Sequence, residues 1–286
     1  MSLNIQPYFD QATFSMTYII SCDATGAAAI IDPVLDYDAA SGATSRVSAD
    51  KVVDYVRDHD LDVKYIMETH VHADHISAAP YLKKTLGGIT CIGEHVKTVQ
   101  ETFAPVFNLE PSFKCDGSQF DRLLSDGDEL ELGEEVIRVL HTPGHTPACV
   151  TYMVGDAMWV GDTFFMPDFG TARCDFPGGD AAVLCASLRK ILSQPDETRM
   201  FMCHDYAPGG RDYEWETTVG EQRAENIHIG GGKTDAEFIK MRSSRDKELS
   251  MPKLILPSVQ VNMRAGFFPP AEGNGVSYLK IPIDQF

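Results

Sequence analysis

Thr69-His70-Val71-His72-Ala73-Asp74-His75 is the stretch of sequence that decides how this chain folds and what it can bind. Three of the nine histidines and an aspartate lie within six residues, at offsets that fit neither an apolar helix face nor an alternating strand. The apolar residues 63–67 come directly before them. Because open α/β sheets carry their sites at the carboxyl ends of strands, the spacing predicts a metal site in a loop that follows a strand.

The overall composition is that of a globular protein, with 43% apolar and 23% charged residues in a chain of 286. The net charge of −18, without a basic run to offset it, argues against a nucleic-acid partner. No apolar stretch approaches the roughly 20 residues of a membrane span, and we see no secretory signal. Seven scattered cysteines without C-x-x-C spacing indicate reduced thiols, so we expect a cytoplasmic enzyme.

Short apolar runs and helical patterns alternate twice along the chain. Strands are expected at 14–22, 27–31, 63–67, 89–92, 130–132, 136–140, 150–154, 158–160 and 200–203. Helices are expected around 52–56, with Ser48 as the N-cap, around 78–86, and at 181–192, 217–226 and 235–245. This order predicts an α/β (α+β) protein in which two sheets pack together with helices outside, a four-layer αββα sandwich, rather than a pure Rossmann sheet.

Single candidate ligands recur downstream, each where an expected strand ends. His145, Asp162 and His204 follow the runs at 136–140, 158–160 and 200–203. Imidazole and carboxylate groups suit Zn²⁺, Fe²⁺ or Mn²⁺. Taken alone, His204 could equally be structural, and Asp162 could be a turn residue. We expect a structural role for His141 and surface positions for the remaining three histidines, His59, His95 and His228.

The order of these motifs resembles the metallo-β-lactamase superfamily, over residues 14–206. The resemblance implies a metallo-β-lactamase-like catalytic domain at 1–210 and a C-terminal extension at 211–286 packed on the same domain. It also implies one metal site made by His70, His72 and His145, a second made by Asp74, His75 and His204, and Asp162 as the bridge between them. Two metals held in this way generate hydroxide by lowering the pKa of bound water.

A narrower resemblance points to different chemistry. Residues 32–35, 68–70, 142–147, 172–176, 204–206 and 261–266 look like the persulfide dioxygenases of the ethylmalonic-encephalopathy-protein type. That family implies one Fe(II) per chain, held by His70, His145 and Asp162, with three positions open for solvent, O₂ and substrate. It oxidises glutathione persulfide with O₂ to sulfite and glutathione in sulfide detoxification, and it implies a possible homodimer or tetramer.

The same resemblance implies roles for the neighbouring residues. Arg173 and Tyr206 would bind substrate, Arg173 by a fork-shaped pair with a glutathione carboxylate. The alternative for Arg173 is a structural ion pair with Asp175 or Asp168. Five further residues would orient the ligands or hydrogen-bond iron-bound water: His72, Asp74, His75, His204 and Asp205. The first four of these could instead hold a second metal.

The chain departs from the dioxygenase pattern in three places. Cys174 stands where a threonine is common, residues 37–45 form an insertion, and the tail after Tyr206 is longer. These features resemble a bacterial subgroup described as β-lactamase-like hydrolases. The alternative function is therefore a binuclear zinc hydrolase of a thioester or lactone, similar to glyoxalase II, with two Zn ions. A third possibility, a metal-bound protein without catalysis, is disfavoured because no ligand position is lost.

Overall fold

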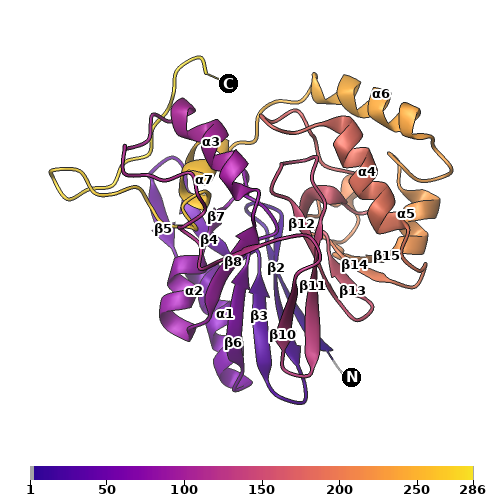
Figure 1. Cartoon of the computed structure of the whole chain (residues 1–286), viewed down its shortest axis with the longest axis horizontal. Coiled ribbons are helices and arrows are strands. Elements are labelled where there is room, and N and C mark those ends of the chain that lie inside the picture. Colours follow the sequence, from indigo (N-terminus) through magenta and orange to yellow (C-terminus); the bar gives the residue numbers. More distant parts are fainter. Residues whose placement is uncertain (1–2, 286) are drawn as a thin grey trace.

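The computed structural model describes residues 3–285 and contains two six-stranded sheets that face each other (Figure 1). In spatial order, the first sheet contains β1 (Leu3–Asp10), β2 (Ser15–Cys22), β3 (Ala27–Ile31), β6 (Asp62–Met67), β8 (Ile89–Gly93) and β9 (Arg122–Leu124). The second contains β10 (Glu129–Leu132), β11 (Glu135–His141), β12 (Val150–Val154), β13 (Ala157–Trp159), β14 (Arg199–Phe201) and β15 (Glu216–Thr218). A small third sheet joins β5 (Ala43–Ser45), β4 (Val34–Asp38) and β7 (Ile76–Ser77).

Helices cover the outer face of each large sheet (Figure 1). The first sheet carries α1 (Val47–Asp58) and α2 (Ala79–Leu86), and the second carries α4 (Ala181–Leu192) and α5 (Val219–Glu225), with α6 (Asp235–Asp246) packed on the outside of α4. Helices α3 (Val96–Val106) and α7 (Ile255–Asn262) lie together at one end of the sandwich. The predicted four-layer αββα architecture is confirmed.

The main core lies between the two sheets, where aromatic side chains from both interlock. Trp159 and Phe201 stack with ring centroids 5.2 Å apart, and Tyr18 meets Phe201 edge-on at 5.7 Å. The Tyr18 hydroxyl donates to the Met202 carbonyl at 2.6 Å, so its buried polar group is satisfied. This contact ties β2 of the first sheet to the end of β14 in the second, next to His204.

One local prediction is wrong, and one expected helix has different bounds. Helix α1 begins after Arg46, so Ser48 lies inside the first turn, where its amide and hydroxyl donate to Asp36 of β4 at 3.0 and 2.7 Å. The Asp36 carboxylate thereby accepts from a backbone amide of the first helical turn, a role that an N-cap side chain usually has. The helix expected at 217–226 is α5, which begins at Val219 because Thr218 ends strand β15 and caps the helix in a capping box with Glu221.

Two further features concern regions that the sequence left open. The insertion at 37–45 is the hairpin of β4 and β5. Strand β15 extends the second sheet beyond residue 210, so the residues assigned to the extension also complete the main sheet. Among residues 3–285, every helix is too short or too polar to cross a bilayer.

Gly144 lies where the loop that carries His145 passes helix α4. Its φ is +135°, and a Cβ there would lie 2.3 Å from Leu184 Cα. We expect Gly144→Ala to lower the free energy of unfolding by about 2–4 kcal/mol, because helix backbone cannot move aside for a methyl group. The control Gly155→Ala also has a positive φ, of 57°, but open space around its Cβ, and should cost about 1 kcal/mol. Equal losses in urea unfolding would contradict this explanation.

Candidate metal centre

Four loops bring the predicted ligands together at one end of the sandwich. The 69–75 loop follows β6, and His145 lies between β11 and β12. Asp162 lies on a 3-10 turn, η1 (Gly161–Thr163), directly after β13, and His204 follows β14. All of the metal-binding candidates except Asp74, which is partly exposed, are buried. The sandwich therefore assembles at one place residues that are up to 134 positions apart, from His70 to His204.

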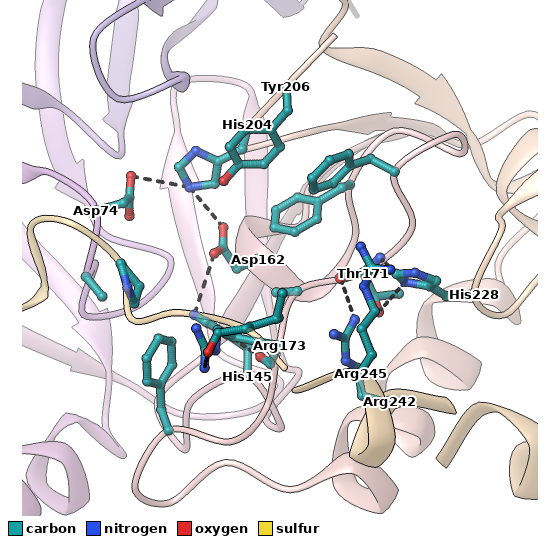
Figure 2. Close-up of a pocket in the computed structure, with 17 residues that line it drawn as sticks. Asp74, His145, Asp162, Thr171, Arg173, His204, Tyr206, His228, Arg242 and Arg245 are labelled. Atoms are coloured by element: carbon teal, nitrogen blue, oxygen red, sulfur yellow. Dashed lines mark hydrogen bonds and ion pairs between the residues drawn. The ribbon is translucent and has the colours of Figure 1, made fainter. Parts of the chain in front are cut away.

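Asp162 lies at the middle of the site (Figure 2). Its Oδ2 is 3.5 Å from His145 Nε2 and 3.9 Å from His70 Nε2, whereas its Oδ1 is 3.2 Å from His204 Nε2. His204 Nε2 also lies 3.5 Å from Asp74 Oδ2. The two carboxylate oxygens of Asp162 thus face two different groups of ligands, as a bridging residue would.

The carboxylate of Asp32 orients two of the histidines. Its Oδ1 accepts from the Thr69 amide at 2.7 Å and from His72 Nε2 at 2.9 Å. Its Oδ2 accepts from the Thr69 hydroxyl at 2.8 Å, and that hydroxyl in turn accepts from His70 Nδ1 at 3.0 Å. These bonds leave His70 Nε2 and His72 Nδ1 as the nitrogens with free lone pairs.

The other histidines are held in the same way. His145 Nδ1 donates to the Arg173 carbonyl at 2.7 Å, and His204 Nδ1 donates to the Phe14 carbonyl at 3.2 Å. His75 Nδ1 lies 3.1 Å from Asp74 Oδ2 and 3.3 Å from the hydroxyl of Ser15. Each of these three imidazoles therefore uses Nδ1 for the protein and leaves Nε2 for a ligand, whereas His72 leaves Nδ1.

The donor set fits a bound metal. His70 Nε2, His72 Nδ1, His75 Nε2 and Asp162 Oδ1 are buried without a hydrogen-bond partner, which is costly unless another group satisfies them. The ligand atoms of His70, His145 and Asp162 lie within 4.8 Å of one another, and so do those of His72, Asp74 and His75. Burial lowers the pKa of His70 well below its usual range, so this imidazole is neutral, as a ligand must be.

A C-terminal residue, Asn262 of α7, holds the histidine loop from the other side. Its Nδ2 donates to the carbonyls of His72 at 2.9 Å and His75 at 2.7 Å, and its Oδ1 accepts from the Ser77 amide at 2.9 Å. Neither Asn262 nor Asp32 was singled out as a site residue in the sequence. The available signals were Asp32 at the end of an expected strand, followed by proline, and Asn262 within a motif of the family.

Arg173 forms the ion pair with Asp175 that was the alternative to substrate binding, and Asp205 is paired with an arginine. The Arg173 guanidinium forms a two-pronged pair with Asp175, at 2.6 and 2.7 Å, and donates to the Ser250 carbonyl at 2.6 Å. Asp205 is paired with Arg211 at 2.6 and 2.7 Å, so its carboxylate is bound away from the metal ligands. Of the two partners considered for Arg173, Asp168 is instead paired with Arg211.

A cavity of about 230 Å³ opens from the metal centre (Figure 2). Asp74, His145, Asp162 and His204 lie at one end, and Arg242, Arg245 and His228 lie at the other. Tyr206 forms part of the wall, 4.5 Å from the ring of Phe169, and Arg173 also reaches the cavity. The structure therefore places both residues that were predicted to bind substrate next to a space that can hold one.

Three of the remaining four histidines lie as predicted, and one does not. His59 and His95 are exposed as expected, and His141 is structural, donating from Nε2 to the Pro147 carbonyl at 2.9 Å. His228, which was expected at the surface, is buried, and its Nδ1 accepts from the Thr171 amide at 2.9 Å. Its glycine-rich sequence surroundings gave no sign that its ring would pack against Gly170 and Thr171.

The chain belongs to the metallo-beta-lactamase superfamily, whose family model matches residues 11–204. It is 53% identical to a protein named probable metallo-hydrolase in Burkholderia pseudomallei, over 99% of both chains. It is 49% identical to glyoxylase B2 of Dictyostelium discoideum, over 99% of this chain and 97% of the other. A beta-lactamase hydrolase-like protein of Agrobacterium fabrum is 52% identical, and the chain spans 65% of its length.

Persulfide dioxygenases are more distant relatives. The human mitochondrial persulfide dioxygenase ETHE1 is 26% identical over 92% of this chain and 88% of its own. The crystal structure of ETHE1 from Myxococcus xanthus superposes with a TM-score of 0.73 and 30% identity, over 92% of this chain and all of the other. Both sequence resemblances, to the superfamily and to the dioxygenases within it, are therefore confirmed as relationships.

The buried His228 predicts a pH dependence of stability. Burial, helped by the charges of Arg242 and Arg245, lowers its pKa to about 4. In the unfolded chain a histidine titrates near 6.5, so between these values the unfolded state binds the additional proton. We expect unfolding free energy to fall as the pH falls through this window, with a contribution of up to about 1.4 kcal/mol per pH unit.

His228→Asn, which keeps an acceptor for the Thr171 amide, should remove that contribution. The measurement is urea unfolding at about pH 7 and about pH 5, with His59→Asn, an exposed histidine at the end of α1, as the control. An unchanged difference between the two pH values in His228→Asn would show that His228 does not titrate in this way.

Proposed function

We propose that this protein is an iron-dependent persulfide dioxygenase that converts glutathione persulfide, O₂ and water to glutathione and sulfite. The observation that carries the proposal is the convergence of His70, His145 and Asp162 within 4.8 Å, at the end of a cavity with room for a substrate. Two histidines and one carboxylate leave coordination positions open on a non-haem iron. The iron would supply the activation of O₂. The relationship to ETHE1 from Myxococcus xanthus supports this assignment.

The residues around the triad would prepare it for this reaction. The Arg173 carbonyl holds the ring of His145, and Thr69 holds the ring of His70. His204 lies 3.2 Å from the Asp162 oxygen that faces away from His70, so it can stabilise the carboxylate in one orientation. Phe165, Phe169 and Tyr206 give the cavity an apolar wall that excludes bulk water beside the reacting sulfur.

The seven cysteines support a cytoplasmic location for this activity, because all of them are free thiols and six are buried. A homodimer or tetramer, and the division into a catalytic domain at 1–210 and an extension at 211–286, remain predictions.

A specific observation favours a second candidate, a binuclear zinc hydrolase of a thioester or lactone. His72 Nδ1 and His75 Nε2 are buried and unpartnered, and Asp74 lies beside them, so a second metal could also be held. The names of the relatives in Burkholderia pseudomallei and Dictyostelium discoideum, metallo-hydrolase and glyoxylase, agree with this alternative.

Metal content and O₂ uptake separate the two functions. Protein purified without air should contain about one iron per chain and consume O₂ only when glutathione persulfide is present. Two zinc ions per chain without O₂ uptake, together with thioester hydrolysis, would overturn the dioxygenase and support the hydrolase.

Two substitutions test the single-iron assignment. His145→Ala removes a ligand and should reduce iron content at least tenfold, whereas His204→Ala should leave iron bound, because His204 is outside the triad. Elemental analysis of the purified variants is the measurement, and His95→Ala, an exposed histidine, is the control. If both variants lose iron, the metal is not held by His70, His145 and Asp162 alone.

A further inference from the structure

The end of the cavity away from the metal ligands is rich in arginine (Figure 2). Arg242 and Arg245 come from α6, near the C-terminal end of this helix, whereas the third arginine of the cavity, Arg173, lies beside His145 (Figure 2). In a chain with a net charge of −18, three guanidinium groups around one cavity mark a site for an anion. Which of them is available depends on the partners that each already has.

Two of the three are committed to the fold. Arg173 donates to Asp175 and to the Ser250 carbonyl, so its guanidinium N–H groups already have acceptors. Arg242 is buried, donates to Asp246 Oδ1 at 2.7 Å, and donates to the Thr171 carbonyl at 3.1 Å. Replacing these contacts with a substrate would leave a buried carboxylate unpaired, which is costly.

Arg245 differs from both. Within residues 3–285 its guanidinium group has no hydrogen-bond or ion-pair partner, its side chain is exposed, and it lines the cavity. His228 lies at the same end of the cavity (Figure 2). Burial and the charges of Arg242 and Arg245 lower its pKa, which indicates that His228 and Arg245 are near each other. Because His228 Nδ1 accepts from the Thr171 amide, a neutral His228 carries its proton on Nε2 and offers one more donor.

We propose that Arg245, assisted by His228, binds a carboxylate of the thiol that carries the persulfide and thereby determines which carrier is used. This inference rests on the proposed function, because it assumes that the sulfur end of the carrier faces the metal ligands. One cavity then spans both ends of the substrate, with its aromatic wall along the middle. The geometry selects a thiol with a carboxylate several bonds from the sulfur, and it disfavours uncharged or very small persulfides.

The test compares glutathione persulfide with the persulfide of glutathione diethyl ester, which has no carboxylate. In Arg245→Met the KM for glutathione persulfide should rise about 10- to 100-fold, because a charge-assisted pair is lost. The KM for the diester should stay within about twofold of its value in the unmodified protein. Since Arg245 is exposed, the preference of the unmodified protein for the acid should also weaken as salt is added.

Lys240→Met is the matched control, because Lys240 is an exposed cation on the same helix that does not line the cavity. It should leave both KM values unchanged. An unchanged KM for glutathione persulfide in Arg245→Met, or equal increases for acid and diester, would overturn the proposal.

A binding measurement separates this inference from the proposed function. Calorimetric titration with glutathione itself needs no oxidation, and Arg245→Met should weaken it about tenfold or more relative to Lys240→Met. If the unmodified protein shows no persulfide-dependent O₂ uptake, the proposed function fails, and the titration still decides whether Arg245 binds the carrier.

Discussion

The carboxylate of Asp32 makes the contacts on which the rest of the site depends. One oxygen accepts from the Thr69 amide and His72, and the other accepts from the Thr69 hydroxyl, which fixes the ring of His70. Asp32 itself has a left-handed φ of +50°, an uncommon backbone state that the surrounding strands hold in place. A single buried group at the end of β3 therefore decides which nitrogens of two histidines face a metal.

The C-terminal part of the chain also holds this site in place. Asn262 of α7 binds the carbonyls of His72 and His75. Asp246 of α6 accepts from the amide of Cys174 at 2.9 Å, directly beside the Arg173 carbonyl that orients His145. Elements outside the family match at 11–204 thus hold the 69–75 loop and the segment that orients His145, and α6 also reaches the far end of the cavity.

Local patterns predicted most of the architecture because burial imposes regular spacing. The runs at 27–31, 150–154 and 181–192 became the elements expected of them, since a strand between two layers or a helix on a sheet needs such apolar residues. The prediction was wrong where a distant partner decided the outcome. Ser48 binds Asp36 instead of capping a helix, and His228 is buried with its ring against Gly170 and Thr171.

The sequence by itself determined which ligand types follow which strands, because a histidine or aspartate at a strand end is a local property. It could not determine the partner of each polar group, since hydrogen bonds reach only about 3 Å and join residues far apart in the chain. Only the tertiary structure assigned Arg173 to Asp175 and left Arg245 without a partner at the cavity. Asp162 fits a turn residue in the sequence because its partners, His145 and His204, are 17 and 42 residues away. Only the fold brings them within 3.5 Å of its carboxylate.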